Sequence, residues 1–320
     1  MGSAQDGGPR GADDSWRPPK RPGLVRRLVR RQRTSIARRR NPDRVARALS
    51  SLPMRLPPPP WVPEGWATGA PDFVGVGVQR AGTSRWFGLI SAHPGVSIHP
   101  DSAKEAHFFD RLNLDALDAD RFAAEYARWF PRLPGTLTGE WTPEYISSFW
   151  AIPLLARAAP DAKLLVSLRD PIDRYASAIA RLRRKSGEQG GWIWGGDLTD
   201  AAARSRYAEQ LEHLFEHFPR EQVLILQYER CRDDPAPELA RTWEFLGLDP
   251  VRLPAGLIDA RVNSLGEHPV LEREVVDALA DWLAPDIARL GELVPELDLG
   301  LWTSWSEAVA RTRSSDPPRP

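Results

Sequence analysis

One short segment, KEAHFFD (residues 104–110), carries several groups that can hold or move a proton. In an extended chain alternate side chains point to the same side, which places Glu105 with His107 and turns Lys104 the other way. A carboxylate in this setting can take the proton of an attacking hydroxyl or amine, with His107 and Asp110 orienting the acceptor or holding Glu105. The alternative is a solvated Lys–Glu pair beside a hydrogen-bonded histidine and a buried aromatic pair.

A second segment, GVQRAGTSRWF (residues 77–87), has the composition of an anion-binding turn. Gly82 permits close backbone approach, Thr83 and Ser84 open a helix, and Arg80 adds a fixed positive charge. Free N–H groups at a helix N-terminus suit a phosphate or a sulfate. The lysine of the GxxxxGK[ST] loop that binds magnesium nucleotides is missing. An ordinary tight turn is the competing interpretation.

A third segment, RDPIDRYASAIARLRR (residues 169–184), follows an apolar run and begins with a helix-opening Pro171. It places Arg169 at the end of a strand and Ser177 two helical turns later. An arginine fork and a hydroxyl can bind one phosphate from two directions. In the alternative, Arg169 pairs with the next aspartate to cap the helix, and Ser177 faces the core.

The elements that must position these segments alternate between short apolar runs and helix-like stretches. Strands are predicted at residues 72–78, 95–99, 162–168 and 222–228, and helices at 83–93, 118–130, 172–185, 200–218, 237–246 and 271–290. This alternation predicts the α/β class, with a central parallel sheet flanked by helices. In such sheets ligands bind beyond the carboxyl ends of the strands. The turn at residues 77–84 and the start of the segment at Arg169 are both expected there.

Charge is distributed unevenly along the 320 residues. Residues 1–60 hold fifteen Arg or Lys against four acids, so the rest is about eleven charges negative although the chain is formally neutral. We predict a basic, largely disordered arm with a proline-rich linker at 1–60, one domain at 61–305 and a disordered tail at 306–320. The arm is either a solvated tail or an amphipathic helix on an anionic membrane or polymer, without specific nucleic acid binding.

Cysteine and hydropathy patterns predict a cytoplasmic protein, with any membrane contact peripheral and confined to the arm. The one cysteine, Cys231, excludes an internal disulfide, and no apolar run has the length of a spanning helix. The six histidines are scattered, so we expect no metal.

Taken together, the Gly-Thr-Ser loop and the Arg…Ser pair, in this order, closely resemble the sulfotransferase superfamily, which has a P-loop-like fold. The resemblance extends over about residues 72–295. It implies that 3′-phosphoadenosine 5′-phosphosulfate (PAPS) is the sulfuryl donor and that no metal is required. It assigns the donor's 5′-phosphosulfate to Arg80, Ala81, Gly82, Thr83 and Ser84. It assigns the 3′-phosphate to Arg169 and Ser177.

The block at 104–110 looks like that of the glycosaminoglycan branch, including heparan sulfate N- and 3-O-sulfotransferases, where the glutamate is the general base. By this resemblance Glu105 is the base, and Arg80, His107 and Lys104 complete the catalytic group. GEWTPEY (residues 139–145) strengthens the likeness and contributes to the acceptor cleft. QYERCRDDP and WEFLGLDP resemble the family's C-terminal part, where we interpret Tyr228 and Glu229 as structural supports.

Three departures bear on the acceptor. Arg80 stands where many members have Lys, although tyrosylprotein sulfotransferases resemble this chain in having Arg there. An arginine stabilises charge without readily giving up a proton. Trp141 replaces a Lys common in the glycosaminoglycan enzymes, and their disulfide is impossible here. We therefore expect a carbohydrate or small natural-product-like acceptor and not a polyanion.

Four residues are predicted to contact that acceptor, two of them in a glycine-rich loop at residues 186–197 that could act as a lid. The predicted acceptor contacts are Asp110, Trp141, Trp192 and Trp194.

Two other functions stay open: a nucleotide kinase that uses Mg-ATP, which needs the missing lysine, and a nucleotide-binding scaffold without catalysis.

Overall fold

Two central strands, β2 (Phe73–Gly77) and β5 (Lys163–Leu168), pair in parallel in the computed structural model, which describes residues 58–110, 119–189, 195–258 and 270–315. β4 (Gly139–Trp141) adds in parallel beside β2, and β6 (Val223–Gln227) beside β5, in the order β4-β2-β5-β6. The chain thus leaves β2 toward one edge and β5 toward the other. Such a switch point opens a crevice at the carboxyl ends of the two strands.

The strands are continuous apolar runs because helices cover the sheet on both faces. Alternate residues enter two separate cores, as the two-residue period of a strand requires. Val74, Val76 and Val166 face one core, together with residues of α5, α8, α12 and α13. Phe73, Leu165 and Leu226 face the other, against α3 and α10.

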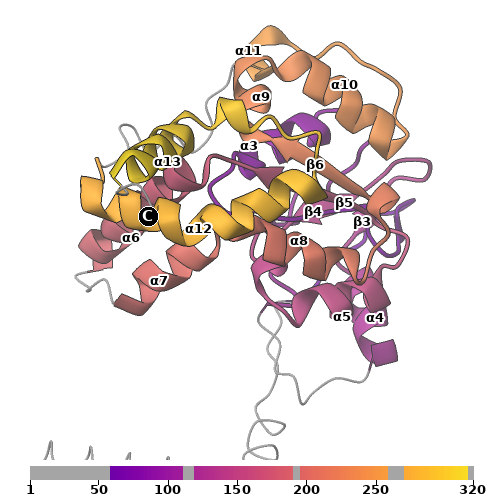
Figure 1. Cartoon of the computed structure of the whole chain (residues 1–320). Helices are drawn as coiled ribbons and strands as arrows, with labels where there is room; N and C mark the ends of the chain where they lie inside the picture. Colours follow the sequence, from indigo (N-terminus) through magenta and orange to yellow (C-terminus); the bar gives the residue numbers. More distant parts are fainter. Residues whose placement is uncertain (1–57, 111–118, 190–194, 259–269, 316–320) are drawn as a thin grey trace, which may run out of the picture. The chain divides into compact units, whose positions relative to one another are not determined.

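The helices follow the strands in the order expected for this class, and all the described residues lie in one unit, Met54–Pro320. Figure 1 shows α12 and α13 packed side by side near the end of the described chain. The α-helices are α3 (Thr83–Ser91), α4 (Ala119–Ala127), α5 (Ala151–Ala158), α6 (Pro171–Gln189), α7 (Gly195–Ala203), α8 (Tyr207–Phe215), α9 (Tyr228–Asp233), α10 (Pro235–Leu246), α11 (Ala255–Ile258), α12 (Arg273–Leu293) and α13 (Thr303–Ser315). Short 3-10 helices lie at η2 (Tyr145–Ser147), η3 (Arg220–Gln222) and η4 (Leu299–Leu301), and β1 (Ala67–Thr68) pairs antiparallel with β3 (Pro131–Arg132).

Three predictions are corrected by the structure. Residues 95–99 form no strand and make only a single bridge, between Val96 and Leu137. The helix expected at 200–218 is two helices, α7 and α8. The domain does not end at residue 305, because α13 continues to Ser315 and Ala308 is fully buried in the core.

No helix among the described residues combines the length and the apolar character needed to cross a membrane. Nearly all of the basic arm lies outside the described residues, so its expected surface contact stays a prediction.

One close approach within the sheet should be sensitive to a single methyl group. A Cβ at Gly75 would overlap the ring of Trp141, a fully buried side chain whose indole N–H donates to the Gly77 carbonyl at 3.1 Å. We expect Gly75→Ala to lower the free energy of unfolding by about 2–3 kcal/mol, because the ring must move within a packed core. Chemical denaturation measures the effect.

The matched control is Gly88→Ala, in the middle of α3, where the added Cβ meets nothing within 4 Å. Its free energy of unfolding should rise by about 0.5–1 kcal/mol, because alanine has a higher helix propensity than glycine. A Gly75→Ala variant as stable as the wild type would contradict the packing described for Trp141.

Candidate active site

The loop between β2 and α3 is held in place from β5. The Val78 N–H donates to the Ser167 carbonyl at 3.0 Å, and the Ser167 hydroxyl donates to the Ala81 carbonyl at 2.7 Å. Gly82 precedes α3 in the left-handed region at φ 75°, where a Cβ would also come within 2.8 Å of the Tyr228 ring. The loop therefore needs glycine at this point, and the prediction that Thr83 and Ser84 open a helix is confirmed.

The residues expected to bind a second phosphate lie beside this loop. Arg169 leaves the end of β5, and its Nη1 donates to the Arg80 carbonyl at 3.1 Å. Its guanidinium also lies over the Tyr228 ring, 4.6 Å from the centroid. Arg80 in turn donates from Nε to the Ser177 hydroxyl at 3.0 Å. The three predicted residues therefore meet at one point, although they are up to 97 positions apart.

Positive charge is concentrated there. Burial, and next the neighbouring Arg181 and Arg169, lower the pKa of Arg80. Crowding several guanidinium groups in a partly buried place is unfavourable unless an anion compensates for it. The arrangement therefore suits a phosphate or sulfate.

The acid that follows Arg169 has a structural task. Asp170 caps α6 by accepting from the N–H of Ile172 at 2.9 Å, and it also accepts from the N–H of Trp305 at 3.0 Å. Burial raises the pKa of Asp170 to about 6. Glu229 accepts from the Asp170 N–H at 2.9 Å and from the Trp302 indole at 3.1 Å, which confirms its interpretation as a support.

The segment at residues 104–110 brings its charged groups together. Glu105 contacts Lys104 Nζ through Oε1 at 2.8 Å and His107 Nε2 through Oε2 at 3.2 Å. His107 Nδ1 contacts Asp110 at 2.7 Å. The expected separation of Lys104 from the other two is wrong, because the segment forms no strand, His107 is left-handed at φ 50°, and the lysine side chain curls back.

Lys104 also joins this segment to the loop. Its Nζ donates to Thr83 Oγ1 at 3.1 Å and to Ser84 Oγ at 3.2 Å. The anion-binding turn and the proton-transfer segment are therefore parts of a single site.

The buried carboxylate of Glu140, in β4, holds the segment at residues 104–110 in place through hydrogen bonds. It accepts from the Ala106 N–H at 2.8 Å, from the Tyr126 hydroxyl at 2.6 Å and from the Tyr145 hydroxyl at 3.0 Å, and Thr142 donates as well. Burial raises the pKa of Glu140, while these hydrogen bonds act against the shift. The sequence analysis missed Glu140, although an acid in the middle of an apolar strand was a usable signal.

A cavity lies beside the loop and Glu105. Its volume is about 640 Å³, a size common for small-ligand sites. Loop residues Gln79, Arg80, Thr83 and Ser84 line it together with Glu105. α6 adds Arg181, Arg184 and Lys185, α7 adds Asp197 and Asp200, and Arg204 follows directly after α7. The α6 cations were missed, although their i, i+3, i+4 spacing places them on one helix face.

α7 is positioned over the cavity by Arg174 of α6, a fully buried side chain. Its Nε donates to the Ser205 hydroxyl at 2.7 Å, and Nη2 donates to the Ala201 carbonyl. The acids of α7, and Arg204 just after it, thereby line the same cavity as the cations of α6.

Glu144 is a second cavity acid that the sequence analysis missed, although it follows β4 directly in TPEY. It accepts from the side-chain amide of Gln79, and burial, then Glu105, raises its pKa. Within the described part of the chain, its buried Oε2 has no hydrogen-bond partner. The cavity therefore offers an acceptor for one further donor group.

The predicted acceptor contacts fare differently. Trp141 is fully buried against the sheet and does not line the cavity, so its expected contact with an acceptor is wrong. Asp110 accepts from His107 instead of lining the cavity. Trp192 and Trp194 lie outside the described residues and stay predictions.

Two groups of side chains have the composition of a metal site. In the cavity, ligand atoms of Glu105, His107 and Glu144 lie within 4.8 Å of one another. His107 donates from both ring nitrogens when protonated, so it then has no lone pair for a metal. This cluster suits a proton network better than a metal.

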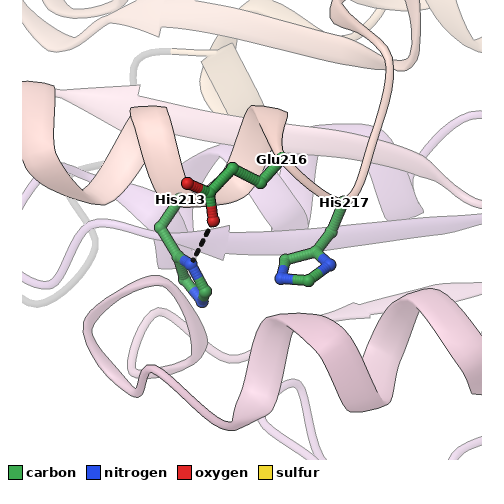
Figure 2. Close-up of side chains that lie close together, drawn as sticks. All are labelled: His213, Glu216 and His217. Atoms are coloured by element: carbon green, nitrogen blue, oxygen red, sulfur yellow. Dashed lines mark hydrogen bonds and ion pairs between the residues drawn. The ribbon is translucent and has the colours of Figure 1, made fainter.

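The second group lies on α8 and the residues after it, away from the elements that line the cavity. Figure 2 shows His213, Glu216 and His217 close together there. The His213 ring contacts Glu216 through Nδ1 at 3.2 Å and the Phe149 carbonyl through Nε2 at 2.9 Å. Both nitrogens of this partly buried histidine are therefore already engaged.

The charges around His107 predict its titration. Asp110, and next Glu105, raise the pKa of His107 to about 10, and His107, with Lys104, lowers the pKa of Glu105 to about 2. The contribution of His107 to stability is complete below its unfolded value near 6.5 and is lost as pH rises toward 10. That of Glu105 is complete above about 4.5 and is lost as pH falls toward 2.

We therefore expect the ring protons of His107 to show no titration in NMR spectra between about pH 5 and pH 8. Asp110→Asn removes the largest cause of the shift and should bring the midpoint toward the ordinary histidine value. Asp281→Asn, on the exposed face of α12, is the matched control and should leave it unchanged. A wild-type midpoint near 6.5 would contradict the network.

Comparisons with known proteins agree with this fold. A family described as "Sulfotransferase family" matches residues 107–252. Heparan sulfate glucosamine 3-O-sulfotransferase 3B1 of Homo sapiens is 30% identical over 249 residues, covering 67% of this chain and 61% of the relative. The human bifunctional heparan sulfate N-deacetylase/N-sulfotransferase 3 is 26% identical over 212 residues, covering 59% of this chain and 24% of the relative.

A solved structure extends the likeness to the fold. The crystal structure of a sulfotransferase from Alicyclobacillus acidocaldarius matches with a TM-score of 0.54 and 27% identity, covering 73% of this chain and 99% of that one. The chain spans about three fifths of the 3-O-sulfotransferases that it matches. With a glycine-hydroxyl loop and an arginine–serine pair at the switch point of a parallel sheet, this chain belongs to the sulfotransferase superfamily, in the branch that includes the heparan sulfate sulfotransferases.

Proposed function

We propose that this protein transfers a sulfuryl group from PAPS to a hydroxyl or amine of a saccharide or small-molecule acceptor. One observation carries the proposal. The loop hydroxyls of Thr83 and Ser84, the carboxylate of Glu105 and the cation of Lys104 form one hydrogen-bonded group at a cavity. A second cationic site at Arg169 and Ser177 lies directly beside it.

The donor explains why two anion sites are adjacent. PAPS carries a phosphosulfate on its 5′ oxygen and a phosphate on its 3′ oxygen. We assign the 5′ group to Arg80 and the backbone of residues 81–84, at the N-terminus of α3, where N–H groups face an anion. We assign the 3′-phosphate to Arg169 and Ser177, with Tyr228 supporting the guanidinium through its ring.

The transfer is an in-line displacement at sulfur. The acceptor oxygen or nitrogen forms a bond to sulfur, the bond from sulfur to the bridging phosphate oxygen breaks, and the electron pair stays on the leaving phosphate. The acceptor's proton passes to Glu105, which is a carboxylate at neutral pH because its pKa is low. Positioned cations stabilise the charge on the leaving group, as in phosphoryl transfer.

Mixed charge in the cavity bears on the acceptor. The cations of α6 face the acids of α7, and Glu144 offers an unused oxygen among the described residues. Such a lining suits an acceptor rich in hydroxyl or amino groups, as saccharides are. Heparan sulfate is named for the relatives, and a saccharide acceptor for this chain is our proposal.

The donor site can be tested by calorimetry with 3′-phosphoadenosine 5′-phosphate (PAP). We expect PAP to bind much more tightly than AMP or Mg-ATP. Arg169→Ala should weaken PAP about 10- to 100-fold, because a charge-assisted contact to the 3′-phosphate is lost, and should leave AMP unchanged. Arg157→Ala, at an exposed position of α5, is the control and should bind PAP normally. Preference for Mg-ATP would replace this proposal with a nucleotide kinase.

The base can be tested separately. Glu105→Gln should keep PAP binding and lose transfer to a saccharide or phenolic acceptor by about 10²- to 10⁴-fold, because the amide cannot take the acceptor's proton. Glu244→Gln, at an exposed position of α10, should transfer at the wild-type rate. Unchanged turnover in Glu105→Gln would remove this residue from the mechanism.

A further inference from the structure

Each of the three N–H bonds of the Lys104 ammonium has a hydrogen-bond acceptor. An ammonium carries three N–H bonds, and three oxygens surround Nζ: Thr83 Oγ1 at 3.1 Å, Ser84 Oγ at 3.2 Å and Glu105 Oε1 at 2.8 Å. All three of these residues line the cavity. A ligand that reaches the loop hydroxyls must therefore compete for this cation.

Arg80, the cation within the loop itself, lines the same cavity but uses its Nε for a residue outside the loop. Its Nε donates to Ser177, the hydroxyl that we assign to the 3′-phosphate. Its carbonyl is held by Arg169. The cation in contact with the loop hydroxyls thus comes from outside the loop, from Lys104.

The three acceptors of Lys104 differ in what they can do when an anion arrives. Each hydroxyl can donate to a phosphosulfate while it still accepts from the ammonium. Glu105 can only accept, and its negative charge repels the incoming anion. The contact between Lys104 and Glu105 is therefore the one that a bound donor weakens.

We propose that Lys104 passes from Glu105 to the phosphosulfate when the donor binds, so that Glu105 becomes an effective base only in the donor complex. This inference rests on the proposed function and adds an order to it: the donor binds before proton transfer is possible. Lys104 then neutralises the leaving phosphate, while the acceptor's proton goes to the released carboxylate. Lys104 keeps its own proton, and no further reactant is needed.

The charges that face Glu105 support the direction of the change. In the resting site His107, and next Lys104, lowers the pKa of Glu105 to about 2, where a carboxylate is a weak base. The charge of a neighbouring acid, Glu144, interacts with the Glu105 carboxylate. Withdrawing Lys104 leaves one cation, one acid and the new anion around Glu105, so its affinity for a proton rises.

Proton uptake on PAP binding tests this directly. PAP is titrated by calorimetry into the full chain at mildly acidic pH, in two buffers of different ionisation enthalpy, which gives the number of protons taken up. Glu105→Gln supplies the background, because it keeps every other titrating group, including the PAP phosphates. Circular dichroism at the same pH checks that both proteins are folded.

We expect the wild type to take up more protons than Glu105→Gln, and the excess to grow as pH falls from neutral toward the raised pKa that Glu105 has in the complex. Equal uptake in the two proteins, with PAP bound in both, would overturn the role of Lys104 and leave the donor site intact. Absence of PAP binding in the wild type would overturn the proposed function, and this inference with it.

A second measurement addresses Lys104 itself. Lys104→Met keeps the length of the side chain and removes its charge. It should show a smaller uptake excess over the Lys104→Met/Glu105→Gln double variant, and a kcat about 10²-fold lower, as when one group that stabilises transition-state charge is deleted.

Lys163→Met is the matched control, since Lys163 begins β5 at the opposite end of the strand and lies over the Phe245 ring. It should match the wild type in both measurements. A wild-type kcat in folded Lys104→Met would contradict the proposal.

Discussion

The parallel pairing of β2 with β5 is the interaction on which the candidate site depends. Adjacent strands lie about 4.8 Å apart, so the loop that follows β2 and the arginine that follows β5 emerge side by side. The register places Gly77 opposite Val166, and Ser167 then holds the loop through its carbonyl and its hydroxyl. A shift of register would move the two proposed phosphate sites apart and turn Ser167 away from the loop.

A second constraint comes from burying a carboxylate. Glu140 lies in a central part of the fold where an unpaired charge would be very unfavourable, and it is tolerated because four donors surround it. Those donors come from the segment at 104–110, from α4 and from the turn after β4. Satisfying one buried acid therefore fixes the backbone that carries Glu105 and His107, and a neutral core residue could not do this.

The electrostatics of the cavity follows the same rule, that a buried charged group needs partners of opposite charge or hydrogen-bond partners. Cations of the loop and of α6 line the cavity, with Arg169 close to Arg80, and acids of α7 and of the segment at 104–110 line it as well. His107, held between two carboxylates, is charged at neutral pH and keeps Glu105 ionised. A cation that already has a carboxylate partner, as Lys104 has in Glu105, can exchange one ion pair for another at modest cost in free energy, which favours a cation shared between resting and donor-bound states.

The sequence by itself determined the elements and their order. The apolar runs at β2, β5 and β6, the glycine and hydroxyl residues of the loop, and the spacing from Arg169 to Ser177 were sufficient to predict a parallel α/β sheet with two anion sites at strand ends. These features are local, because strand period, helix opening and glycine backbone freedom act within a few residues. The same local signals joined α7 and α8 into one helix at 200–218 and placed a disordered tail where α13 continues to Ser315, since tertiary packing decides both points.

Only the tertiary structure decided which partner each charged side chain has. Lys104 was expected to point away from Glu105 and instead bonds to it and to two loop hydroxyls, while Trp141, expected at an acceptor, is buried against Gly75. Glu140, Glu144 and the α6 cations gained their roles from elements far away in the sequence. Hydrogen bonds and ion pairs depend on distances of a few ångströms between such elements, and the residue pattern of one segment carries no information about those distances.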